Sequence, residues 1–276
     1  MRLAFSESGE GPPLLLLSGL GCDRTFWAGH RPLLSSRARV IAPDNRGSGE
    51  SPAPAGPYTA SEMAGDALAL LDELGVESAD VAGHSLGGMI ALETALAAPS
   101  RVRSLVLLSA CARCHPRTAF CIEVAATLWQ QGCAPESLVR TFLTWTASAS
   151  VLADPGLVEW LVAAQLSPRV PQPLAAWQAQ AAAVRGFDAR SRLGEIRCPT
   201  LVLAGDEDVL VPPSAARELS AGIRGARLEV SPGAGHNSAA EDAPATCERL
   251  LRFLGERPTV PRRRACTIRG TSRRRT

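Results

Sequence analysis

The fold is decided by the ten residues that read Asp80-Val81-Ala82-Gly83-His84-Ser85-Leu86-Gly87-Gly88-Met89. They join a short apolar run to a helical pattern through a Gly-x-Ser-x-Gly sequence. A serine nucleophile needs this context, because a sharp, strained turn between strand and helix presents its Oγ at the strand's carboxyl end. A Cβ at Gly83 or Gly87 would collide across such a turn. The pattern predicts a nucleophilic Ser85, with the N–H of Leu86 as one oxyanion donor.

Short apolar segments of strand length recur along the chain, at 14–18, 40–43, 80–82, 104–109, 200–204 and 226–230. Several are apolar throughout, which is typical of strands buried on both faces. Helical patterns lie between some of them, at 60–74 and 86–98, and another follows the last of them, at 241–254. Because strands that alternate with helices form parallel sheets, the sequence predicts an α/β fold with a doubly wound, mostly parallel sheet.

The alternation stops between residues 110 and 193. Four helical patterns fit this stretch, at about 117–131, 136–147, 156–166 and 173–185. Asp154 before Pro155 is a typical N-cap with proline at the first helical position. Four of the five tryptophans also lie here. We expect a helical cap or lid over 111–190, inserted between core segments 1–110 and 191–257.

A nucleophilic serine needs a base, and the chain has four histidines. His236 follows the last predicted strand and precedes the last predicted helix, so it should lie at the carboxyl edge of the sheet. His30 and His115 adjoin other elements. His84 lies within the turn itself and should face away from the serine, because strand side chains alternate. The spacing therefore favours His236 as the base.

The acid should follow the preceding strand, where residues 205–208 read Gly-Asp-Glu-Asp. Either Asp206 or Asp208 could reach back over the edge of the sheet toward the base. In both cases the chain order is serine, acid, histidine, as in one group of serine hydrolases. A purely structural role does not readily explain three such residues at the ends of three different strands.

The loop Ser18-Gly19-Leu20-Gly21 follows the first buried strand and could supply a second oxyanion donor, the N–H of Leu20. A glycine-rich loop can also bind phosphate. The chain contains no lysine, which excludes a Walker site. No Gly-x-Gly-x-x-Gly pattern follows a strand, which excludes a dinucleotide-binding loop.

Composition and charge narrow the class of protein further. The chain has 276 residues and is 46% hydrophobic, so it can bury a large core. It shows neither an apolar run of membrane-spanning length nor a secretory signal, and we expect a cytoplasmic protein without a membrane partner. Residues 1–257 carry 22 arginines against 27 acids, a net charge of −5 that argues against nucleic-acid binding. The tail, 258–276, carries seven arginines and no acid, and we expect it to be disordered.

Eight cysteines raise the question of disulfides, metal or haem. Residues 111–115 match the Cys-x-x-Cys-His spacing of haem attachment, but attachment requires export. A zinc site would need a second pair of ligands at a suitable spacing. We expect reduced thiols and no metal.

Several of these segments, over roughly residues 3–256, together resemble the α/β-hydrolase superfamily: 18–21, 44–51, 83–88, 205–208 and 235–236. The opening Gly-Leu-Gly-x-Asp before Trp27, the sequence around Tyr58 and Met63, and the four-helix lid are similar to those of 3-oxoadipate enol-lactonases and related esterases. The resemblance implies the α/β-hydrolase fold, with a lid inserted after the sixth strand. It also implies that the acid is Asp208, the last position of Gly-x-x-Asp. Many members have His-Gly where this chain has Ser18-Gly19, which puts the loop geometry and the substrate class in doubt.

The resemblance and the residues together imply hydrolysis of a small-molecule carboxylic ester or lactone by Ser85, His236 and Asp208, without metal or organic cofactor. Four tryptophans are candidates for the substrate pocket, although packing of the lid is an equally good role for those within it: Trp27, Trp129, Trp145 and Trp160.

Three alternatives remain open for this constellation of residues. The same triad could hydrolyse a carbon–carbon bond or perform cofactor-free perhydrolysis of the haloperoxidase type. The chain could instead be a non-catalytic ligand receptor, although an intact triad argues against that. A nucleic-acid binder that uses the basic tail is disfavoured by the acidic body. The sequence leaves a homo-oligomer open.

Overall fold

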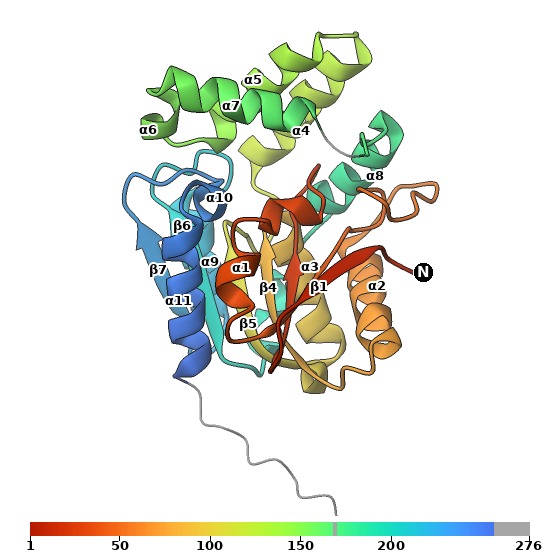
Figure 1. The fold of residues 1–276 in the computed structure, drawn as a ribbon, viewed down its shortest axis with the longest axis vertical. Coiled ribbons are helices and arrows are strands. Elements are labelled where there is room, and N and C mark those ends of the chain that lie inside the picture. Colours follow the sequence, from red (N-terminus) through yellow and green to blue (C-terminus); the bar gives the residue numbers. More distant parts are fainter. Residues whose placement is uncertain (168–169, 257–276) are drawn as a thin grey trace, which may run out of the picture.

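A seven-stranded sheet forms the centre of the computed structural model, which describes residues 1–167 and 170–256 (Figure 1). The strand order is β1-β3-β2-β4-β5-β6-β7. β1 is antiparallel to β3, and the other neighbouring pairs are parallel, which confirms the predicted mostly parallel sheet. The bounds are β1 (Phe5–Ser8), β2 (Pro13–Leu17), β3 (Arg39–Pro43), β4 (Ala79–His84), β5 (Val102–Leu108), β6 (Thr200–Gly205) and β7 (Arg227–Ser231).

The central strands are buried on both faces, because alternate side chains enter two separate apolar clusters. Leu15 and Leu17 of β2 belong to one cluster, to which helices α2 (Ala60–Glu73), α3 (Leu86–Ala97) and α9 (Pro213–Gly222) also contribute buried side chains. Leu14 and Leu16 pack on the opposite face, with α1 (Arg31–Leu34) and α11 (Ala243–Gly255). Helices on both faces make the sheet doubly wound, and the apolar runs in the sequence predicted this arrangement.

The remaining short elements of the core are three 3₁₀ helices and one α-helix, η1 (Arg24–Trp27), η2 (Pro99–Arg101), η3 (Arg190–Glu195) and α10 (Ser238–Glu241). The parallel register brings Leu17, Gly83, Leu107 and Val202 side by side across four strands. The carboxyl ends of β2, β4, β5 and β6 therefore meet at one edge of the sheet. This edge is where a doubly wound sheet places its ligand site.

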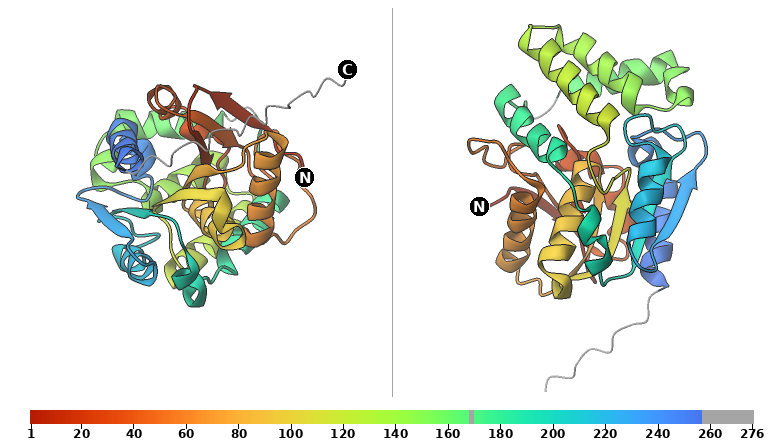
Figure 2. Two further views of the ribbon diagram at one scale, coloured as in Figure 1. Left: turned by 90° about the horizontal axis from the view of Figure 1, so that it is seen from below. Right: turned by 180° about the vertical axis from the view of Figure 1, so that it is seen from behind.

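Five described α-helices lie between β5 and β6 and cover this carboxyl edge of the sheet, with α4 to α7 as an outer layer (Figures 1 and 2). They are α4 (Pro116–Gln130), α5 (Pro135–Thr146), α6 (Ala149–Leu152), α7 (Pro155–Leu166) and α8 (Leu174–Arg185). The four predicted helices are present, and Asp154 Oδ1 caps α7 by accepting from the N–H of Leu157 at 3.1 Å. The predicted position after a sixth strand is wrong. The resemblance implied six strands before the insertion, whereas this chain forms five.

Three further features concern the edge strand, the basic tail and membrane-spanning helices. The first strand, β1, was not predicted, because its sequence Phe-Ser-Glu-Ser carries a single apolar residue and pairs only at the sheet's edge. The basic tail, 258–276, lies outside the described residues. Among the residues that are described, no helix has the length and hydropathy of a membrane span.

The burial of β5 at the centre of the sheet can be tested by measuring protein stability. Leu107 is fully buried between two parallel strands, so Leu107→Ala should lower the free energy of unfolding by about 2–5 kcal/mol. Leu33→Ala is the matched control, because Leu33 of α1 is 42% exposed. Urea unfolding followed by circular dichroism measures both. Equal unfolding midpoints for the two variants would contradict the assignment of β5 to the core.

Candidate active site

Ser85 occupies a strained turn between β4 and α3, with φ 53° and ψ −117°. A non-glycine residue in such a region costs about 1–3 kcal/mol, and strain of this kind is concentrated at functional sites. Every residue from 79 to 95 is buried except Ser85. Its N–H donates to the carbonyl of Leu108 at the end of β5, at 2.9 Å. The turn therefore exposes one hydroxyl within an otherwise buried stretch.

The glycines around Ser85 are required by close backbone contacts. A Cβ on Gly83 would overlap the backbone of Gly87, and a Cβ on Gly87 would overlap the carbonyl of Leu17 in β2. A Cβ on Gly19 would lie 3.4 Å from the Cβ of Ser85. The loop after β2 is therefore packed directly beside the serine, as the sequence predicted for an oxyanion loop.

His236 and Asp208 form a buried pair at the neighbouring strand ends. The Nδ1 of His236 lies 2.8 Å from Oδ2 of Asp208. The N–H groups of Leu210 and Val211 donate to Oδ1 at 3.0 and 2.7 Å, which holds the carboxylate in place. A carboxylate accepts the proton of Nδ1–H, and so the neutral ring is left with an unprotonated Nε2, the atom a general base needs.

The other acidic residues of this loop have different partners. Asp206 is exposed and accepts a hydrogen bond from the N–H of Gly233 at 2.6 Å. Glu207 accepts from the N–H of Ala149 in the lid at 2.7 Å. The structure thus pairs the histidine with Asp208, the acid that the resemblance indicated, and not with Asp206.

Two side chains hold the main chain of His236. Its carbonyl accepts from Nε2–H of His84 at 3.0 Å and from Oγ–H of Ser109 at 2.8 Å. Burial foremost, and then the neighbouring His236, lowers the pKa of His84 to about 3, so its ring is neutral. A carbonyl can only accept, and His84 therefore carries its proton on Nε2.

Sequence reasoning did not identify Ser109. It follows β5 with φ 47°, so the two non-glycine residues with positive φ among those described are serines at the ends of adjacent strands. Serine directly after a buried strand was the available signal, but without the Gly-x-Ser-x-Gly frame it is too common to use.

The two predicted oxyanion donors belong to the residue after Ser85 and to the loop after β2. Leu86 follows it in sequence and begins α3. Leu20 belongs to a tight turn in which the N–H of Cys22 donates to the carbonyl of Gly19 at 3.2 Å. Asn45 Nδ2 donates to the carbonyl of Ser18 at 2.9 Å and fixes the start of this loop. Ser18 is the residue at which the sequence departs from the family pattern. Its main-chain carbonyl is the group that Asn45 holds.

The four candidate pocket tryptophans separate into two groups. Trp27 is fully buried among the apolar side chains beneath α1 and α11, and Trp160 is 64% exposed on α7. Neither position suits a pocket residue: the first belongs to the protein core and the second to the outer surface of the lid. We therefore drop both from the candidate pocket.

Trp129 and Trp145 are half-buried within an aromatic cluster of the lid. Ring centroids are 5.9 Å apart for Trp129 and Trp177, 6.1 Å for Phe142 and Trp177, and 5.8 Å for Phe142 and Trp145. A Cβ on Gly21 would lie 3.3 Å from Nε1 of Trp177. Trp177, which was not among the pocket candidates, thus brings this cluster into contact with the loop beside the serine.

The lid is joined to the loops that carry His236 and Asp208. The carbonyl of Thr146, at the end of α5, accepts from the N–H of Asn237 at 2.9 Å. Glu207 accepts from the N–H of Ala149 at the start of α6, as described above. A Cβ on Gly235 would overlap the lid's backbone at Thr146–Ser148. The lid therefore rests directly on the candidate site.

The Cys-x-x-Cys-His sequence has a local structural role. His115 is the N-cap of α4, and its Nδ1 accepts from the N–H of Arg117 at 3.2 Å. Burial raises the pKa of both Cys111 and Cys114. All seven cysteines in the described part of the chain are free, and no cluster of three or more potential metal ligands occurs there.

The glycine contacts generate a testable difference between two variants. Gly87→Ala should abolish most activity and lower the unfolding temperature, because its Cβ overlaps main chain that has to shift, at a cost of about 1–3 kcal/mol. Gly65→Ala, in the exposed face of α2, meets nothing within 4 Å and should be neutral or slightly stabilising. Thermal unfolding and ester hydrolysis measure both variants. An active, fully stable Gly87→Ala enzyme would contradict the described turn.

Comparisons with known proteins agree with this architecture. The sequence profile of the alpha/beta hydrolase family matches residues 14–250. A protein from Azorhizobium caulinodans, provisionally named the carbamate hydrolase RutD, is 37% identical over 255 residues, 92% of this chain and 95% of that protein.

Two crystal structures are also similar. The enol-lactonase from Burkholderia xenovorans has a TM-score of 0.82 at 28% identity, over 92% of this chain and 96% of that one. A Mycobacterium tuberculosis protein, provisionally titled the non-heme bromoperoxidase BpoC, has a TM-score of 0.85 at 28% identity, over the same shares. The match across the core, together with the relative that covers nine-tenths of the chain, shows that this chain belongs to the alpha/beta hydrolase family and is a hydrolase.

Proposed function

We propose that the protein is a serine hydrolase that cleaves a small-molecule carboxylic ester or lactone through an acyl-enzyme. The observation that supports this most strongly is the buried 2.8 Å pair of His236 and Asp208 at the sheet edge where strained Ser85 is accessible. The similarity to an enol-lactonase structure agrees with this substrate class.

The proposed reaction uses only side-chain and main-chain groups of this chain. Ser85 Oγ attacks the acyl carbonyl while Nε2 of His236 takes its proton. Asp208 holds the ring in the required tautomer and stabilises the imidazolium that forms. The N–H groups of Leu20 and Leu86 bind the oxyanion, each worth about 10²- to 10³-fold in rate. Water then hydrolyses the acyl-enzyme with the same histidine as base, so neither metal nor organic cofactor is required.

In this proposal, residues 111–190 act as a cap on the core formed by 1–110 and 191–257. The half-buried Trp129 and Trp145 belong to an aromatic cluster that reaches the loop beside Ser85 through Trp177. Apolar, ring-lined surface next to a nucleophile suits the organic part of a small substrate. The organic part of the substrate is therefore expected to contact this cluster.

A small carbamate is the second candidate substrate. The relative from Azorhizobium caulinodans carries that activity in its provisional name. A carbamate carbonyl lies between oxygen and nitrogen and would be attacked by the same serine through the same tetrahedral intermediate. Perhydrolysis also uses this triad, and the structural similarity to a protein titled a bromoperoxidase keeps it among the reactions to test.

A substrate panel and an active-site probe test the proposal. p-Nitrophenyl esters, lactones and carbamates are compared in hydrolysis, and the preferred ester is repeated with peroxide. A fluorophosphonate should label the wild-type protein and should not label Ser85→Ala. Hydrolysis that survives in Ser85→Ala would rule out the proposed nucleophile, and labelling without turnover of any class would favour the ligand-receptor alternative.

The acid assignment generates a matched pair of variants. Asp208→Asn presents an amide to Nδ1 of His236 and favours the wrong tautomer, so kcat should fall by as much as ~10⁴-fold. Asp206→Asn should cost little, because its carboxylate is exposed and bonded to Gly233. Both should still react with a fluorophosphonate, slowly in the first case. A crippled Asp206→Asn enzyme beside a normal Asp208→Asn enzyme would reverse the assignment.

A further inference from the structure

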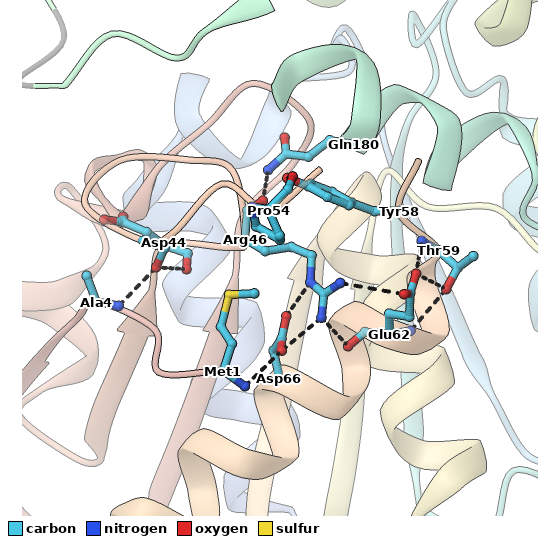
Figure 3. Close-up of polar contacts among 11 residues, drawn as sticks. Met1, Ala4, Asp44, Arg46, Pro54, Tyr58, Thr59, Glu62, Asp66 and Gln180 are labelled. Atoms are coloured by element: carbon cyan, nitrogen blue, oxygen red, sulfur yellow. Dashed lines mark hydrogen bonds and ion pairs between the residues drawn. The ribbon is translucent and has the colours of Figure 1, made fainter. Parts of the chain in front are cut away.

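One lid residue, Gln180, hydrogen-bonds two loops of the core at once. It lies on α8 and is fully buried. Its Oε1 accepts from the N–H of Gly21 at 3.3 Å, in the loop beside Ser85. Its Nε2 donates to the carbonyl of Arg46 and to Oγ of Ser48, both at 2.8 Å, and Figure 3 shows the amide pointing from α8 toward Arg46.

The orientation of this amide follows from its partners. The carbonyl of Arg46 can only accept, so the group facing it must be the NH₂ of Gln180. The carbonyl oxygen of the side chain is then left for the N–H of Gly21. A reversed amide would place two carbonyl oxygens against each other and two N–H groups against each other.

The loop of Arg46 is a fixed support. The guanidinium of Arg46 donates to both carboxylate oxygens of Asp66 on α2, with Nε at 2.5 Å and the second nitrogen at 3.0 Å, and lies 5.4 Å from the ring centroid of Tyr58 (Figure 3). The Asp66 carboxylate is buried. Gln180 is therefore held at one end by a loop that is itself anchored to the core.

The loop of Gly21 is closed by a main-chain turn and by Ser18, whose Oγ donates to the carbonyl of Asp23 at 3.0 Å. Gly21 has φ +75° and is the third residue of the tight turn closed between Gly19 and Cys22. The central peptide of this turn carries the carbonyl of Leu20 and the N–H of Gly21, and the N–H of Leu20 lies in the adjoining peptide. The bond from Gly21 to Gln180 therefore restrains the turn one residue away from the N–H of Leu20.

We propose that Gln180 is a positioning residue for the oxyanion loop: the lid fixes the turn that presents the N–H of Leu20 to the reacting carbonyl. This inference rests on the proposed function, because it assigns Leu20 as an oxyanion donor. In this proposal, helix α8 covers the site and also positions the loop that carries Leu20. Loss of Gln180 should then weaken stabilisation of the transition state more than substrate binding.

The test replaces Gln180 with a side chain of similar length that makes no hydrogen bond. Gln180→Met should lower kcat for p-nitrophenyl acetate by about 10- to 100-fold, part of the value of one oxyanion donor, with KM changed less than about threefold. The inhibition constant of 1,1,1-trifluoro-4-phenylbutan-2-one, whose serine adduct carries an oxyanion, should rise by a similar factor. Gln178→Met is the matched control, because Gln178 is half-buried on the same helix and makes neither loop contact among the described residues. It should leave kcat, KM and inhibition unchanged.

Three outcomes would overturn the inference: an unchanged kcat in Gln180→Met, an equal loss in Gln178→Met, or a loss confined to KM. If Gln180→Met does not fold, Ser48→Ala removes one acceptor of the same amide. It should lower kcat about threefold at unchanged KM, and no change in kcat would equally overturn the inference. Failure of the proposed function is distinguished separately, because hydrolysis would then persist in Ser85→Ala.

Discussion

The strained backbone of Ser85 is the constraint on which the rest of this structure depends. A residue at φ 53° between a strand and a helix is stable only if its surroundings hold it there. The N–H of Ser85 donates to the carbonyl of Leu108 on the adjacent strand. In addition, β2 packs so closely against α3 that Gly87 cannot carry a Cβ. The buried parallel sheet therefore supplies the energy that keeps one hydroxyl exposed at its edge.

The same edge holds His236 through its main chain as well as its side chain. Asp208 holds the ring of His236, while His84 and Ser109 hold its carbonyl. These contacts come from the ends of three different strands, so the position of the ring is tied to the register of the sheet. Because burial keeps His84 neutral, its hydrogen bond does not add a second charge beside the pair.

Helices α5 to α8 take part in this organisation by contacting three loops of the candidate site. The α5–α6 turn bonds the loops that carry His236 and Asp208, and Gln180 on α8 bonds the loop beside Ser85. The aromatic cluster reaches the same loop through Trp177. The packing of these helices is therefore linked to the positions of the loops at the sheet edge.

The sequence by itself determined the elements whose signals are local. Apolar runs predicted the buried strands, because a strand covered on both faces needs apolar side chains at every position. Glycine spacing predicted the turn at Ser85, and the order of strand ends placed His236 and an acid at one edge. Only the tertiary structure decided the contacts between distant segments. It paired His236 with Asp208, buried Trp27 in the core while leaving Trp160 exposed, and brought Gln180 to Gly21, 159 residues away in the chain. A glutamine, a serine or a tryptophan carries no local pattern of its own, and its partner is fixed only when the helices pack on the sheet.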